Sequence, residues 1–218
     1  MIASVPWIDR LAHDLRGPLT PLQTAAYLLR SGQVTPERQQ ELFALIDRQT
    51  RQLVRMIDEL GDWTRASQQR LVAAPEACDP ALLVDYARAN SGTAGAEAIV
   101  ENHADDVVLQ GDPVRLTQLL RVLIEYASAH GRAPATIVLS AVESRLRIDV
   151  CSAGSAPDAE ELAALFERPH PAAHDEGLGL QLLIAHAIAR GHDGSLAADA
   201  DDDGRLRLRC ELPLTQHD

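Results

Sequence analysis

Lysine is missing from this chain of 218 residues, so arginine supplies all 20 of its basic side chains. Acidic residues number 32, which gives a net charge of -12 at pH 7. A surface that binds nucleic acid needs clustered basic charge, so this balance argues against nucleic acid as a partner. Aromatic residues make up only 3% of the chain. Aliphatic side chains must therefore fill most of its core.

Long apolar runs and paired cysteines are also lacking. No uninterrupted apolar run approaches the ~20 residues of a membrane-spanning helix, and the N-terminus lacks the pattern of a signal peptide. Cys78, Cys151 and Cys210 are odd in number and scattered, without the spacing of metal ligands. We therefore expect a cytoplasmic protein with reduced thiols, no membrane span and no bound metal.

Near the N-terminus, apolar residues recur at intervals of three and four. They are Ile8, Leu11, Leu15, Leu19, Leu22, Ala26 and Leu29. This spacing predicts a helix from about Trp7 to Arg30, which Gly17, Pro18 and Pro21 should bend. His13 falls outside the apolar face and has Asp14 beside it. An imidazole that faces solvent offers a nucleophilic ring nitrogen near neutral pH, although a plain surface histidine is the simpler interpretation.

A second long helix follows a connector over residues 31–34. Thr35 and Pro36 have the pattern of an N-cap followed by the first helical residue. Apolar residues gather on one side of this helix: Leu42, Leu45, Ile46, Leu53, Met56, Ile57, Leu60 and Trp63. Two such helices form an antiparallel hairpin that buries its apolar stripes poorly by itself. We expect a homodimer with a four-helix bundle; the alternative is a hairpin packed on the rest of its own chain.

Prolines near residues 73–80 mark a junction, which divides the chain into domains 1–72 and 76–218. Short alternating runs in the second domain predict strands at residues 98–101, 107–110, 136–141, 146–151, 196–200 and 206–212. Helices are predicted at 79–87, 113–130 and 178–189. This order indicates an α+β protein, in which the second domain is a two-layer sandwich with helices on one face of a sheet.

Four motifs carry a resemblance to a known family. His13-Asp14-Leu15-Arg16-Gly17-Pro18-Leu19-Thr20 closely resembles the phosphoacceptor motif of bacterial sensor histidine kinases. The other three resemble the nucleotide-binding boxes of that family, in the same order. They are Gly111-Asp112-Pro113 with Arg115-Leu116, Leu165-Phe166-Glu167-Arg168, and Glu176-Gly177-Leu178-Gly179-Leu180.

The resemblance implies a dimerisation and phosphotransfer hairpin followed by an ATPase-type α/β sandwich. In active members a γ-phosphoryl group moves from ATP, with Mg²⁺, to the histidine and then to an aspartate of a response-regulator receiver domain. The resemblance makes His13 the phosphoacceptor and Asp14 its orienting or acid–base partner, and it places Arg16 in the same catalytic motif.

The nucleotide boxes depart from the family pattern. Tyr126 stands where the family has its Mg²⁺-binding asparagine, and a phenol cannot present an amide carbonyl to the metal. Ser152 replaces the adenine-binding aspartate of the first glycine box, in which only Gly154 remains. Gly177 and Gly179 complete this degenerate nucleotide site. Residues 169–175, the expected nucleotide lid, carry His170 and His174 but neither lysine nor arginine. Gly17 replaces the threonine or asparagine of phosphatase-competent relatives.

Three functions follow as hypotheses. In the first, the chain is a kinase-derived histidine phosphotransferase that relays phosphoryl groups between His13 and receiver aspartates, without cofactors. In the second, it is an active ATP-dependent histidine kinase that uses ATP and Mg²⁺. In the third, it is an adaptor that binds a response regulator without transferring a phosphoryl group.

Overall fold

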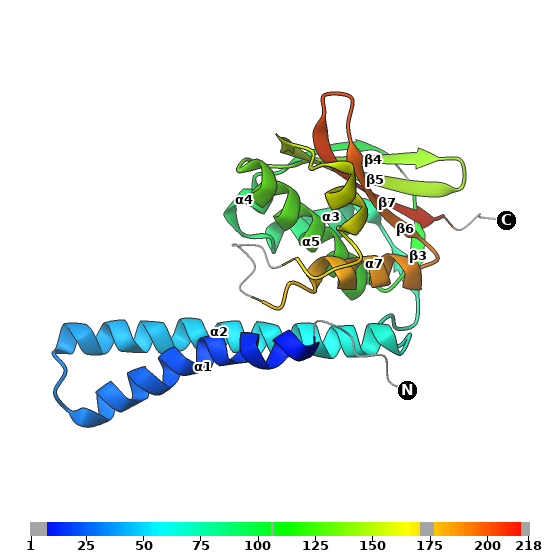
Figure 1. Cartoon of the computed structure of the whole chain (residues 1–218). Helices are drawn as coiled ribbons and strands as arrows, with labels where there is room; N and C mark the ends of the chain where they lie inside the picture. The colour runs from blue at the N-terminus through cyan, green and yellow to red at the C-terminus, as the bar shows by residue number, and fades with distance from the viewer. Residues whose placement is uncertain (1–7, 106, 171–176, 215–218) are drawn as a thin grey trace. The chain divides into compact units, whose positions relative to one another are not determined.

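The computed structural model describes residues 8–105, 107–170 and 177–214. The chain forms two compact units, drawn in Figure 1. The first consists of Met1–Gly61 with Pro169–Leu180, and the second of Asp62–Arg168 with Gln181–Asp218. No helix within the described ranges has the length and apolar character needed to cross a membrane.

The first unit contains the predicted helical hairpin. Helix α1 spans Ile8–Ser31, and helix α2 begins at Pro36 and ends at Ser67. Thr35 caps α2, since its Oγ1 accepts a hydrogen bond from the Arg38 amide at 3.3 Å. Gly32 has a φ of +65°, a left-handed conformation that ends α1. Both predicted helices are confirmed, although Trp7 lies outside the described residues.

At two positions of α1, the buried residue comes one residue before the residue that was predicted to be buried. Pro18 and Ala25 are buried, whereas Leu19 is 43% exposed and Ala26 is exposed. Pro18 and Ala25 each precede by one residue a position that the apolar pattern predicted to be buried, Leu19 and Ala26.

The second unit is built on a five-stranded sheet with the strand order β2-β4-β5-β7-β6. Its strands are β2 (Ile99–His103), β4 (Thr136–Val142), β5 (Arg145–Ser155), β6 (Ser195–Ala200) and β7 (Arg205–Pro213). Strand β2 pairs with β4 in parallel, and the other pairs are antiparallel. A separate antiparallel pair joins β1 (Glu76–Cys78) to β3 (Leu109–Gly111). The strands predicted at 136–141 and 146–151 pair as β4 and β5, and those predicted at 196–200 and 206–212 pair as β6 and β7.

Helices cover one face of this sheet, as the α+β prediction requires (Figure 1). They are α3 (Pro80–Ala89), α5 (Pro113–Gly131) and α7 (Gln181–Gly191), with short helices α4 (Gly92–Ala96) and α6 (Ala159–Ala164) beside them. Along β5 and β7 every second residue is buried. These inward side chains meet the fully buried Leu119, Leu123 and Ile124 of α5 and form an aliphatic core.

Helix α7 begins three residues later than predicted. The apolar pattern predicted a start at Leu178, but Gly179 has a φ of +73°, which an α-helix does not accommodate. Residues 177–180 therefore form a turn ahead of the helix. The short elements β1, α4 and α6 were also not predicted, because each spans six residues or fewer.

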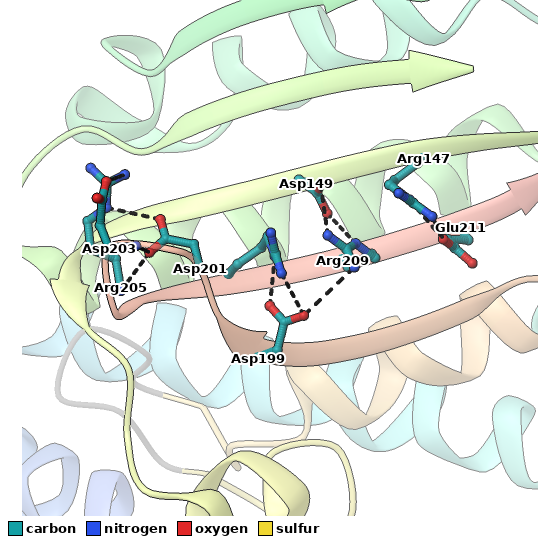
Figure 2. A network of polar contacts seen from close by, with 9 residues as sticks. Arg147, Asp149, Asp199, Asp201, Asp203, Arg205, Arg209 and Glu211 are labelled. Atoms are coloured by element: carbon teal, nitrogen blue, oxygen red, sulfur yellow. Dashed lines mark hydrogen bonds and ion pairs between the residues drawn. The ribbon is translucent and has the colours of Figure 1, made fainter. Parts of the chain in front are cut away.

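The opposite face of the sheet is covered by paired charges (Figure 2). Arginine and acidic side chains on neighbouring strands form cross-strand ion pairs at 2.7 to 2.9 Å: Arg207–Asp199, Arg209–Asp149 and Arg147–Glu211. Each partner is partly exposed, so every pair contributes modestly to stability. Because these arginines are neutralised within the sheet, this face offers few free positive charges to an anionic partner.

The end of α2 belongs to the second unit. Asp62 accepts hydrogen bonds from Arg115 Nη1 at 3.0 Å and from Gln118 Nε2 at 2.8 Å, both on α5. Eleven residues on, the Ala73 amide donates to Asp112 Oδ2 at 2.9 Å. These contacts hold residues 62–73 to α5. The compact units thus divide the chain between Gly61 and Asp62, within α2. The division into domains 1–72 and 76–218 stays a prediction.

Candidate functional site

His13 lies in the N-terminal part of α1, where its side chain is 88% exposed. Its Nδ1 lies 3.3 Å from Asp14 Oδ1. An ionised carboxylate only accepts hydrogen bonds, so this contact favours the tautomer with the proton on Nδ1. The Nε2 lone pair is then left for nucleophilic attack, and Nε2 has no partner in the described part of the chain.

The helix around His13 leaves room for a substrate. Gly17, one turn after His13, is exposed, and a Cβ added there would meet nothing within 4 Å. Pro18 has no N–H, so the Asp14 carbonyl lacks its usual helical donor. The Arg16 side chain is exposed and lies three residues after His13, on the same side of the helix. His13 and Asp14 are thus in contact, and the exposed Arg16 follows them within one turn of the same helix.

This arrangement is suited to phosphoryl transfer. The imidazole supplies a nucleophile that Asp14 orients, and the Arg16 guanidinium can neutralise charge on a transferred phosphoryl group. No other side chain has to take part in bond making, because positioning and charge neutralisation supply most of the catalysis of phosphoryl transfer.

In the second unit, Tyr126, which the resemblance aligns with the Mg²⁺-binding asparagine of the family, lies on α5. Its ring stacks on His130, with 6.3 Å between the ring centroids. Burial, and to a lesser extent the negative charge of Glu161, raise the pKa of Tyr126, so the phenol stays protonated at neutral pH. The neighbouring Glu125 carboxylate is bound by Arg121 at 2.9 and 3.0 Å. These residues do not fit the oxygen-rich shell that Mg²⁺ requires at this position.

Ser152 and Gly154 lie where β5 meets the end of α5. Ser152 is 2% exposed, and its Oγ accepts a hydrogen bond from the Gly154 amide at 3.0 Å. A Cβ added to Gly131 would lie 2.7 Å from the Ala153 nitrogen, so the two backbones are in close contact. The nearby His130 Nε2 lies 2.8 Å from the Ser155 carbonyl oxygen; because a carbonyl oxygen only accepts hydrogen bonds, Nε2 carries the proton and donates. The Ser152 hydroxyl is thus engaged within its own turn rather than turned outward toward an adenine.

Gly177 and Gly179 belong to the first compact unit, in the turn ahead of α7. The His170 amide donates to the Gly179 carbonyl at 3.0 Å. The amides of Leu178 and Leu180 both donate to Oε2 of Glu59 on α2, at 2.8 and 3.3 Å. The other predicted lid histidine, His174, lies outside the described residues.

The predicted residues therefore fall into three local groups. His13, Asp14 and Arg16 share one stretch of α1, and Tyr126, Ser152 and Gly154 meet through His130 at the end of α5. Gly177 and Gly179 form a turn whose amides bind Glu59, a residue that the sequence analysis missed. Only its place on a helix with alternating charges was visible in the sequence. Across the described ranges, no three histidine, cysteine or acidic side chains come together as metal ligands.

Comparison with known families gives two matches, one for each part of the chain. Residues 7–69 match the His Kinase A (phospho-acceptor) domain. Residues 111–216 match the ATPase family described as histidine kinase-, DNA gyrase B- and HSP90-like. The two matches together include His13, Tyr126, Ser152 and both glycines of the turn.

Curated relatives are sensor proteins and sensor histidine kinases. The chain is 31% identical to the sensor protein ChvG of Agrobacterium fabrum, over 87% of this chain and 35% of that protein. It is 27% identical to the sensor histidine kinase TrcS of Mycobacterium tuberculosis, over 96% of this chain and 44% of that protein. The chain thus spans between about a third and a half of the length of these relatives.

Solved structures share the fold. The histidine kinase AdeS of Acinetobacter baumannii superposes with a TM-score of 0.74 at 21% identity, over 94% of this chain and 98% of that one. The histidine kinase ThkA, solved in complex with the response regulator TrrA, gives a TM-score of 0.72 at 18% identity, over 97% of this chain and 62% of that one.

Proposed function

The chain belongs to the two-component histidine kinase family, and we propose that His13 is its phosphoacceptor. The observation that carries the proposal is the geometry at His13: a highly exposed ring, oriented by Asp14, within a matched phosphoacceptor domain. In the proposed reaction, the Nε2 lone pair attacks a phosphoryl group and the bond to the leaving oxygen breaks. The phosphoryl group then passes from His13 to a carboxylate oxygen of a receiver aspartate, which restores the imidazole.

We propose ATP as the first candidate for the phosphoryl donor. Sensor histidine kinases among the relatives and the match to the ATPase family favour this function. The turn that contains Gly177 and Gly179 adds a structural reason, because its Leu178 and Leu180 amides already converge on an anionic group. Backbone amides at the start of a helix suit a phosphate group in the same way. ADP would be the leaving group, and we assign no step to Mg²⁺, because Tyr126 does not fit it.

A phosphorylated receiver domain is the second candidate donor, in which case the chain relays phosphoryl groups. The side-chain contacts within the nucleotide boxes specifically favour this relay function. Tyr126 is protonated and stacked on His130, Glu125 is bound by Arg121, and the Ser152 hydroxyl is engaged by the Gly154 amide. None of these side chains is arranged to take a metal ion or an adenine.

The experiment that tests both candidates measures label on His13. The chain is incubated with γ-labelled ATP or, separately, with a labelled phospho-receiver domain, and the labelled residue is identified by mass spectrometry. His13→Asn should abolish labelling, whereas His103→Asn, at another exposed histidine, should leave it intact. Label from ATP supports the kinase, and label from the receiver alone supports the relay. If neither donor labels His13, the phosphoacceptor proposal is wrong and an adaptor that binds a regulator remains.

We also propose that the hairpin pairs with a second copy of the chain to form a four-helix bundle. Several large apolar side chains of the first unit are exposed: Leu19, Tyr27, Phe43, Val54 and Ile57. Burying them against a second hairpin removes this apolar area from water. Ile57→Glu should shift the chain from dimer to monomer in sedimentation, whereas Gln23→Glu, at an exposed polar position, should not.

The proposed partner is a response-regulator receiver domain. The fold is shared with a histidine kinase that was solved in complex with a response regulator. Phosphoryl exchange with a receiver domain would place the chain in the cytoplasm. The three free thiols, those of Cys78, Cys151 and Cys210, are compatible with that compartment.

A further inference from the structure

Glu59 is a buried acidic residue on α2 that the proposed reaction does not use. It is only 7% exposed, although an ionised carboxylate is costly to bury without partners. One oxygen, Oε2, accepts two hydrogen bonds, from the Leu178 amide at 2.8 Å and from the Leu180 amide at 3.3 Å. These two donors lie about 120 residues away in the sequence and define where the carboxylate sits.

The donors belong to the turn Gly177-Leu178-Gly179-Leu180, which comes directly before α7. Gly179, in its left-handed conformation with a φ of +73°, lets the amides on either side of it point at a single atom. Backbone amides that converge in this way form a concave site for an anion.

We propose that Glu59 is a built-in competitor of phosphate: its carboxylate occupies the anion position of the glycine turn. A phosphate group of a nucleotide must displace this side chain before it can use the same two amides. The inference deepens the proposed function and rests on its first candidate, in which the glycine turn receives nucleotide phosphates. It adds regulation to that function, because a change that withdraws Glu59 from the turn makes the amides available.

The charges of the two groups support competition between the Glu59 carboxylate and a phosphate group for the same amides. Hydrogen bonds from amides to a carboxylate are charge-assisted and stronger than those between neutral groups. A phosphate oxygen has the same sign of charge and accepts from the same donors, so the two groups exclude each other. Neutralising Glu59 weakens the internal competitor and leaves the donors in place.

The test compares Glu59→Gln with Asp58→Asn, which makes the same change of charge at the preceding, exposed residue. The glutamine has the same size as the glutamate, so the fold should persist, and circular dichroism checks this. Calorimetric titration uses ATP and, as an anion without adenine, inorganic tripolyphosphate. We expect the Glu59→Gln chain to bind both about tenfold more tightly than the unchanged chain, and the Asp58→Asn chain to match the unchanged chain.

Hydrogen exchange provides a second readout. The amides of Leu178 and Leu180 should exchange slowly in the unchanged chain and faster after Glu59→Ala, and tripolyphosphate should slow them again in that variant. Equal affinities of the unchanged and Glu59→Gln chains would overturn the proposal, as would an absence of anion binding by both.

Labelling of His13 separates this proposal from the proposed function. A Glu59→Gln chain that binds no anion but is labelled by a phospho-receiver overturns the competitor role and supports the phosphoacceptor. A chain that binds tripolyphosphate more tightly but is never labelled at His13 supports the competitor role and contradicts the phosphoacceptor.

Discussion

Asp62, near the end of α2, contacts α5. Replacing it with alanine should destabilise the second unit more than replacing any other acidic residue of α2 would. Asp62 accepts hydrogen bonds from Arg115 Nη1 at 3.0 Å, from Gln118 Nε2 at 2.8 Å and from Arg65 Nη2 at 2.6 Å. Its side chain is 11% exposed and that of Arg115 is 19% exposed. Removing the carboxylate leaves a largely buried guanidinium without its counter-charge.

The expected loss follows from these contacts. Breaking one side of a fully buried ion pair costs about 3–5 kcal/mol. Arg115 keeps a hydrogen bond to Gln118 Oε1 at 2.7 Å, and Arg65 is half exposed and can turn to water. We therefore expect Asp62→Ala to lower the free energy of unfolding by about 2–3 kcal/mol. Asp58→Ala, at an exposed position of the same helix, should change it by less than about 0.5 kcal/mol.

Urea titration followed by circular dichroism and by tryptophan fluorescence measures this difference, and its pH dependence provides a further check. Burial would raise the pKa of Asp62, but the hydrogen bonds from Gln118 and Arg65 and the charge of Arg115 outweigh it and hold the pKa below its ordinary value of 3.8. The contribution of Asp62 is therefore complete well above pH 3.8 and is lost as the pH falls through the lowered value. Equal stability of Asp62→Ala and Asp58→Ala at pH 7 would refute the reasoning.

Three further predictions concern stability. Gly17→Ala should raise the free energy of unfolding of the hairpin by about 0.5–1 kcal/mol in a thermal melt, because alanine favours a helix and its Cβ would meet nothing within 4 Å; an unchanged melting temperature would contradict this. Gly131→Ala should cost about 1–3 kcal/mol in urea titration, because its Cβ would lie 2.7 Å from the backbone nitrogen of Ala153, and a neutral effect would mean that the two backbones separate easily. Asp199→Asn should lower the free energy of unfolding by about 0.5–1 kcal/mol, because the two contacts with Arg207 are lost. This loss should shrink in 1 M salt, whereas a loss independent of salt would point to packing instead.

Sequence reasoning singled out His13 as the candidate phosphoacceptor because its signals are local. The three-and-four spacing of apolar residues places His13 on the outside of a helix, and Asp14 is its immediate neighbour. The structure places both groups as expected. The same reasoning placed two buried positions of α1 one residue too late, because compact residues such as Pro18 and Ala25 carry little weight in an apolar pattern.

The features that sequence reasoning missed depend on contacts between distant segments. Glu59 and Asp62 look like ordinary charged residues of an amphipathic helix, and only the folded chain shows that each has backbone or side-chain donors from another element. The late start of α7 has a local cause, the positive φ of Gly179, which an apolar pattern does not reveal. The alternation of arginine and leucine in β7 predicts a charged face, but the identity of each acidic partner depends on the order of strands.

The central claim is that His13 accepts a phosphoryl group, and mass spectrometry of the chain after incubation with each donor tests it most directly. We predict one phosphate on His13, stable in base and lost in acid, that disappears in His13→Asn and persists in His103→Asn. Phosphate found on another residue in the His13→Asn chain, or no phosphate on His13 from either ATP or a phospho-receiver, would contradict the account.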